Sequence, residues 1–95
     1  MKNLNHLVKK LLGGKTITLF YNRYNDGSEE NPDITIDHLF AEIETSETYK
    51  DIVIKLSKEN DETIWDTYEV YRIPYLTNFK ILKSILKEAT KQSHN

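Results

Sequence analysis

The first apolar residues of the chain recur every three or four positions, as they do on one face of a helix: Leu4, Leu7, Val8, Leu11 and Leu12. Gly13 and Gly14 end this pattern, because glycine tolerates the left-handed backbone that often closes a helix. We therefore expect an amphipathic helix over residues 4–12.

Alternating apolar residues predict four strands after this helix. In the first strand, Ile17 and Tyr21 are expected to share one face while Phe20 takes the other. Residues 22–33 are rich in turn formers. The alternation then resumes in three further segments: residues 34–45, 49–57 and 63–73. Pro74 ends the last of them, because proline cannot donate a hydrogen bond to a sheet ladder.

Helical spacing returns over residues 76–91, with an apolar face of five residues: Phe79, Leu82, Ile85, Leu86 and Ala89. Residues 92–95 are expected to be frayed. The predicted fold is therefore α+β, a single small domain over residues 1–95 with the order α-β-β-β-β-α. Short turns between consecutive strands favour an antiparallel four-stranded meander, with the N- and C-terminal helices packed on one face.

Composition limits the size of the core and excludes several kinds of site. The chain has 95 residues, of which 38% are hydrophobic, so it can bury only a small core. It contains no cysteine, which excludes disulfides and thiolate metal sites and fits a reducing compartment. Its apolar runs are too short to span a bilayer, and the N-terminal segment lacks the continuous apolar stretch of a signal peptide. We expect a cytoplasmic protein without a membrane partner.

Charged residues are sorted into blocks, although the net charge is only −2. Residues 1–25 contain five basic side chains and no acid, and residues 80–95 contain four lysines and one glutamate. Residues 26–49 contain no lysine or arginine but eight carboxylates: Asp26, Glu29, Glu30, Asp33, Asp37, Glu42, Glu44 and Glu47. Together with the adjacent Tyr24, these eight residues form the predicted partner-binding surface.

A negative surface of this kind attracts a basic partner and selects it by charge complementarity. Carboxylates on one face of a strand lie about 6.5–7 Å apart, roughly the phosphate spacing of a nucleic-acid strand, so nucleic-acid mimicry is physically reasonable. Small phage-encoded inhibitors of nucleic-acid enzymes are similar in type, being short, acidic on one side and poor in cysteine, although no motif is shared. The leading hypothesis is a non-enzymatic protein-binding module, an inhibitor or adaptor of the phage or mobile-element type. The alternative is a solvated segment that the domain's own basic helices balance.

Two other classes of function stay open. A small regulator could bind nucleic acid through a set of basic helix residues: Lys9, Lys10, Lys80, Lys83 and Lys87. A pI of 5.9 makes direct nucleic-acid binding the less favoured expectation. An assembly subunit could instead form a homodimer by pairing edge strands.

Aromatic side chains make up 11% of the chain, and some could line the sheet face opposite the helices. The candidates for that face are Phe20, Val53 and either Tyr68 or Tyr71. An aromatic patch rimmed by carboxylates would suit a protein interface, whereas core packing and edge protection explain the same residues. Trp65 is expected to anchor the core.

No set of residues predicts catalysis, a cofactor or a metal site. His6, His38 and His94 lack the spacing of metal ligands, and adjacent strand residues such as Asp37 and His38 point to opposite faces. Residues 13–16 (Gly-Gly-Lys-Thr) lack the earlier glycine of a phosphate-binding loop and precede a strand rather than a helix. We therefore expect no enzymatic activity and no cofactor.

Overall fold

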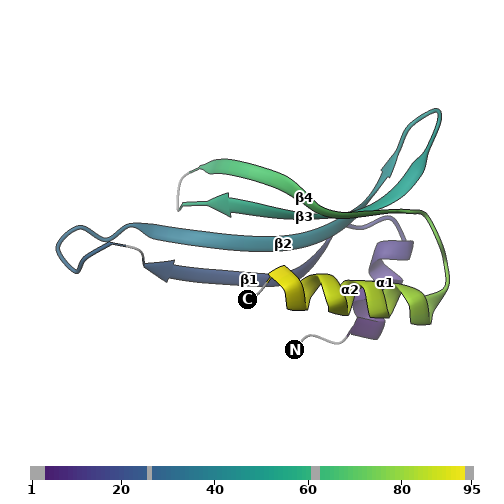
Figure 1. Cartoon of the computed structure of the whole chain (residues 1–95), viewed down its shortest axis with the longest axis horizontal. Helices are drawn as coiled ribbons and strands as arrows, with labels where there is room; N and C mark the ends of the chain where they lie inside the picture. The colour runs from purple at the N-terminus through teal and green to yellow at the C-terminus, as the bar shows by residue number, and fades with distance from the viewer. Residues whose placement is uncertain (1–3, 26, 61–62, 94–95) are drawn as a thin grey trace.

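The structure is a computed structural model that describes residues 4–25, 27–60 and 63–93. Its elements follow one another along the chain: α1 (Leu4–Leu12), β1 (Ile17–Asn25), β2 (Ile34–Thr45), β3 (Lys50–Glu59), β4 (Ile64–Pro74) and α2 (Phe79–Ser93). Each strand pairs antiparallel with the next, in the spatial order β1-β2-β3-β4. Both helices cover the same face of this sheet (Figure 1). The predicted α+β meander is confirmed.

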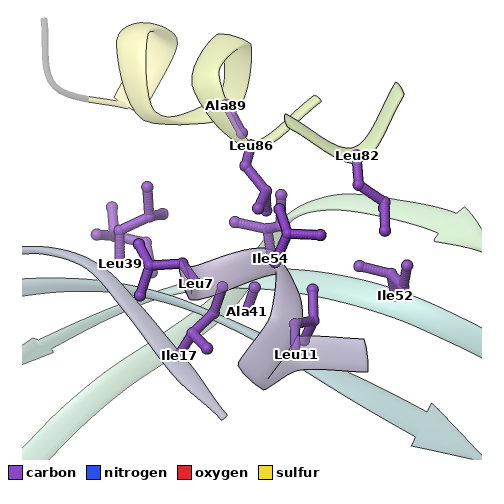
Figure 2. Close-up of a cluster of buried hydrophobic side chains, with 12 residues drawn as sticks. Leu7, Leu11, Ile17, Leu39, Ala41, Ile52, Ile54, Leu82, Leu86 and Ala89 are labelled. Carbon is purple, nitrogen blue, oxygen red and sulfur yellow. The ribbon is translucent and has the colours of Figure 1, made fainter. Parts of the chain in front are cut away.

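The core forms between the two helices and one part of the sheet. Cross-strand partners of β2 and β3 place aliphatic side chains on the helix-side face: Leu39 with Leu56, Ala41 with Ile54, and Ile43 with Ile52. Leu11 of α1 and Leu86 of α2 pack onto this face and are fully buried (Figure 2). Burial of such side chains contributes about 25 cal/mol per Å² of apolar surface and is the main term that favours folding.

Glycine closes α1 as its position in the sequence predicts. Gly14 adopts a φ of 90°, which a residue with a side chain rarely tolerates. The Lys15 N–H donates to the Lys10 carbonyl at 3.0 Å, and the Gly14 N–H donates to the Leu11 carbonyl at 2.9 Å. This pair of bonds is the Schellman arrangement, which satisfies carbonyls that the end of a helix would otherwise leave free.

α2 begins later and ends later than expected. The Asn78 side-chain oxygen accepts the Ile81 N–H at 3.0 Å, so Asn78 is the N-cap and the helix starts at Phe79 rather than residue 76. The helix continues to Ser93. Residues 92 and 93, expected to be frayed, are therefore helical, and residues 94–95 lie outside the described part.

A β-bulge in β1 reverses the predicted faces of its aromatic residues. The register with β2 shifts within residues 18–20, so Phe20 pairs with Leu39 on the helix side and Tyr21 pairs with His38 on the opposite face. The predicted faces of Phe20 and Tyr21 are wrong, because one extra residue inverts the positions that follow it.

The meander gives the molecule two different ends. The last residues of β1 and β3 and the first residues of β2 and β4 extend beyond the helices at one end, which we call the hairpin end (Figure 1). The helices lie toward the other end, which we call the helix end. The longest dimension of the molecule, 49 Å, runs in this direction (Figure 1). Neither helix, over its described residues, has the length and apolar character needed to cross a membrane.

Candidate functional site

The seven predicted carboxylates that the structure describes lie in separate places and do not form one surface. Two are on the open face, the sheet face that carries no helix: Glu42 and Glu44. One is on the helix-side face: Asp37. Three are in the β1–β2 turn at the hairpin end: Glu29, Glu30 and Asp33. Glu47 lies in the β2–β3 turn at the opposite end of the sheet, and Asp26 lies outside the described residues.

On the open face, basic residues of β3 and β4 neutralise the carboxylates of β2. Lys55 Nζ donates to Glu42 Oε1 at 2.7 Å, and Arg72 Nη2 donates to Glu44 Oε1 at 3.1 Å. Arg72 also pairs with Asp51 at 2.7 Å. The strand register places these side chains on the same face. The cation partners of Glu42 and Glu44 therefore come from the sheet and not from the helices.

This ion-pair network changes the proton affinity of its acids. Tyr49 donates a hydrogen bond to Glu44 at 2.7 Å, and this bond, with a second from Arg72, lowers the pKa of Glu44. A hydrogen bond from Arg72 likewise lowers the pKa of Glu69. Both shifts favour the ionised carboxylates, so the pairs are fully formed at neutral pH.

Asp37 is also paired within the domain. Lys58 Nζ donates to Asp37 Oδ1 at 2.8 Å, and the Tyr24 hydroxyl donates to the same oxygen at 3.5 Å. The bond to Asp37 raises the pKa of Lys58. Tyr24, predicted to belong to the partner-binding surface, is therefore half-buried beside an internal ion pair.

Residues 27–33 of the β1–β2 turn, in contrast, are shaped by hydrogen bonds that do not involve the side chains of Glu29, Glu30 and Asp33. The Asn25 side-chain oxygen accepts the N–H groups of Gly27 at 2.8 Å and Asp33 at 3.1 Å. The Ser28 N–H donates to the Asn31 carbonyl at 3.2 Å, and the Asn31 N–H donates to Ser28 Oγ at 3.0 Å. A Cβ atom on Gly27 would lie 2.2 Å from the Asn31 carbonyl oxygen, so this turn requires glycine. The turn therefore has a defined shape.

Glu29 and Glu30 lie in this turn with their side chains exposed. Within the described part of the chain, no ion pair involves either of them or Asp33. Together with the exposed Glu47 at the opposite end of the sheet, they are the members of the predicted set that form no ion pair within the described residues.

Two further acids belong to the hairpin end but not to the predicted set. Glu59 and Asp66 flank the β3–β4 turn, which lies at the same end as the β1–β2 turn because a meander reverses direction at every strand. The sequence prediction missed these two acids because it grouped charges by their position along the chain. The predicted meander could have identified them, because it brings the start of β4 and the end of β3 to the same end of the sheet as the β1–β2 turn. Over residues 22–37 and 58–66, the described positions hold six carboxylates and two basic residues.

The aromatic contacts on the open face involve residues other than those predicted. The His38 ring lies 5.6 Å from the Tyr21 ring and 5.2 Å from the Phe40 ring, measured between centroids. Thr18 Oγ1 lies 2.9 Å from His38 Nε2. This cluster forms because the bulge turns Tyr21 to the open face.

The residues predicted for the open face have different positions. Tyr68 and Tyr71 pair with buried aliphatic residues of β3, which places them on the helix-side face, and Tyr68 remains 45% exposed there. Val53 is on the open face as predicted but is fully buried, and Phe20 faces the helices. The side chain of Trp65 lies outside the described part.

The helix end carries the opposite charge. The two helices and the linker after α1 contain seven lysines and one glutamate: Lys9, Lys10, Lys15, Lys80, Lys83, Lys87, Lys91 and Glu88. Among the described residues, none of these lysines forms an ion pair, whereas Lys55, Lys58 and Arg72 of the sheet all do. α1 and α2 contact each other, so their lysines belong to one layer.

Both edges of the sheet are irregular. β1 contains its bulge, and the register between β3 and β4 shifts twice, next to Lys55 and next to Glu59. β4 also carries three charged side chains: Asp66, Glu69 and Arg72. Bulges and charges on edge strands discourage pairing with another copy, so the geometry does not favour a homodimer formed in this way.

Comparison with known proteins gives no match to a family model, a curated protein or a solved structure. The two oppositely charged ends of the molecule are therefore the features from which its function can be inferred.

Proposed function

We propose that this chain is a small non-catalytic protein-binding module that engages a basic partner through the β1–β2 turn of its hairpin end. The observation that supports this proposal is the difference in pairing between two groups of acids. The strand carboxylates Glu42, Glu44 and Asp37 have cation partners inside the domain. In the described structure, Glu29 and Glu30 have none. A paired carboxylate must lose its cation before it meets a partner, whereas an unpaired one exchanges only water.

The shape of the turn adds to its suitability for binding. A segment that already has its bound conformation loses less conformational entropy when it associates. Asn25 closes the base of the turn with two hydrogen bonds, and Ser28 and Asn31 brace its centre. The carboxylates of Glu29 and Glu30 are therefore presented from a preorganised backbone.

The surrounding charge would guide the encounter. An acidic surface raises the association rate with a basic partner and makes that rate sensitive to salt. The excess of carboxylates at the hairpin end provides such a surface. We place this interaction in the cytoplasm, supported by the absence of cysteine. An adaptor or inhibitor acts by binding alone, so this contact would be sufficient for such a function.

Nucleic-acid mimicry has less support than a general basic partner. Mimicry requires a row of unpaired carboxylates at strand spacing. Glu42 and Glu44 have that spacing, but Lys55 and Arg72 neutralise them. We therefore assign binding to the turn and not to the strand.

The test is affinity capture of partners from the native cell by the wild-type chain and by Glu29→Lys/Glu30→Lys. The variant should lose the partner that the wild type retains, because it reverses two unpaired charges and breaks no ion pair. The matched control is Glu47→Lys/Glu88→Lys, which makes the same change in net charge at two exposed positions away from the hairpin end. The control should capture the same protein as the wild type. Equal capture by all three chains would exclude the turn as the binding site.

Gly27→Ala separates the effect of the turn's shape from the effect of its charge. The added methyl group collides with the Asn31 carbonyl, so the turn must change conformation while every charge remains. Calorimetric titration of the captured partner should show at least a tenfold weaker affinity, with unfolding of the variant nearly unchanged. An unchanged affinity would show that charge alone determines binding.

A further inference from the structure

Four lysines form a continuous line along α2: Lys80, Lys87 and Lys91 are exposed, and Lys83 is half-buried. We call this line the lysine ridge. Its spacings of three and four residues keep it on one side of the helix, and it extends about 16 Å at 1.5 Å per residue. The opposite side of α2 is buried against the sheet through Leu82 and Leu86 (Figure 2).

The ridge lacks the features of a protein-binding or membrane-binding surface. Protein interfaces depend on aromatic or aliphatic anchors and are depleted in lysine, but Ser84 is the residue that lies among these lysines. Ile81 is 49% exposed but lies on the flank of the helix, one position from the buried Leu82. A helix that binds a membrane inserts its apolar face, and the apolar face of α2 is already buried in the core.

We propose that the helix end binds the phosphate backbone of double-stranded nucleic acid without sequence specificity, through the lysine ridge and through Lys9 and Lys10 of α1, the helix that contacts α2. Lysine side chains contact phosphates as point charges and need no further complementarity. The helix lysines are free for such contacts, because in the described structure no carboxylate is paired with them. This inference uses the end of the molecule opposite to the proposed protein-binding turn and does not depend on it.

The acidic net charge does not oppose this binding. A pI of 5.9 averages over the whole chain, whereas the charges are separated along a molecule 49 Å long. At physiological salt, electrostatic interactions are screened over about 8 Å. A duplex in contact with the ridge therefore experiences mainly the local excess of lysines, and repulsion from the hairpin end orients the molecule with its helices toward the nucleic acid.

The expected affinity is that of a non-specific complex, with a Kd on the order of 10⁻⁴–10⁻⁶ M at physiological salt. Each phosphate contact contributes about −0.9 to the slope of log K against log salt concentration. Four ridge contacts alone therefore predict a slope of about −3 to −4, and contacts from Lys9 and Lys10 as well would steepen it to about −5.

The test is fluorescence anisotropy with the full chain and a labelled random-sequence duplex of about 20 base pairs, over about 20–200 mM KCl. Lys83→Gln/Lys87→Gln should weaken binding about tenfold or more at low salt and reduce the slope by about 2. The matched control is Arg23→Gln/Lys50→Gln, which removes two exposed charges from the sheet and should leave both quantities nearly unchanged. Circular dichroism of all three chains should be measured as well, to check that each one is folded.

Two further arms separate nucleic acid from other anions. Poly-glutamate and vesicles that contain phosphatidylserine should bind more weakly than the duplex at the same salt concentration. Equal or tighter binding to either one would overturn the assignment to nucleic acid. The proposal is also wrong if the wild type fails to bind the duplex at the lowest salt, or if the ridge variant binds as well as the control.

Discussion

Arg72 and Val53 are cross-strand partners on the sheet face that carries no helix, and Val53 is nonetheless fully buried. The cover comes from the long charged side chains around it. Glu42, the partner of Val53 on β2, is held by Lys55, while Arg72 is held by Glu44 and Asp51. The ion-pair network thus shields an apolar side chain from water, with the aliphatic stems of arginine and lysine as the covering surface.

Replacing Arg72 should therefore destabilise the domain through charge and through packing. In Arg72→Leu, three carboxylates that share one cation would repel one another: Glu44, Asp51 and Glu69. The urea midpoint should fall clearly at neutral pH and much less at about pH 4, where glutamates without a cation partner begin to take up protons. Lys80→Leu on α2 is the control, because Lys80 is exposed and forms no ion pair within the described residues, and it should show no such pH dependence. An equal loss at both pH values would show that the guanidinium does not hold these acids.

The wild-type protein should lose stability in acid for the same reason. The pKa values of Glu44 and Glu69 are lowered from 4.5 in the folded state. A carboxyl group with a lowered folded-state pKa contributes stability above its unfolded pKa and loses that contribution as the pH falls through the folded value. Thermal unfolding followed from neutral pH downwards should show the melting temperature decline below about pH 4.5. Glu44→Gln/Glu69→Gln should be less stable than the wild type at neutral pH and should show a smaller decline.

A side chain at Gly14 should destabilise the domain although there is space for one. A Cβ atom at this position meets no atom within 4 Å, so any effect of Gly14→Ala comes from its φ of 90°. We expect a loss of about 1 kcal/mol in the free energy of unfolding. Gly13→Ala is the matched control, because its Cβ would make 3.4 Å contacts with the Lys9 and Lys10 carbonyls and its φ is not positive. A loss at Gly13 equal to that at Gly14 would contradict the conformational explanation.

The attachment of α2 should depend on Leu86. Leu86→Ala leaves a cavity at a fully buried position and should reduce the free energy of unfolding by about 2–5 kcal/mol. Lys87→Ala, one residue along on the exposed side, should change it by no more than about 0.5 kcal/mol. Denaturation by urea measures both values. Similar effects for the two variants would mean that α2 is not fixed to the sheet by its apolar face.

Periodicity predicted the order of the elements because each one has a single buried face. Residues 34–45 show the clearest alternation, and β2 occupies that range. The bulge in β1 could not be predicted, since it depends on how Phe20 and Tyr21 pair with β2 rather than on any local pattern. The start of α2 could have been predicted from Asn78, a residue typical of N-caps.

The candidate site was predicted less well because charge was grouped by position along the chain. Arg72 neutralises Glu44 from 28 residues away, a relationship that only the strand register reveals. Glu29 and Glu30 are exposed because turn residues have few neighbours to pair with, and their role in partner binding stays a prediction. The sequence thus shows where charged residues occur along the chain, whereas the pairing of strands decides which of them form ion pairs.

The strict sequence order of the sheet also has a consequence for folding. Every strand pair joins neighbours along the chain, so three hairpins can form from local contacts. The helix layer differs, because α1 is the first element of the chain and α2 is the last. The contact between them can therefore form only after the whole sheet has been synthesised. During synthesis, the part of the helix-side face that Leu82 and Leu86 of α2 cover therefore stays open to solvent until α2 has been made. We expect this interval to be the stage at which the growing chain is most prone to aggregation.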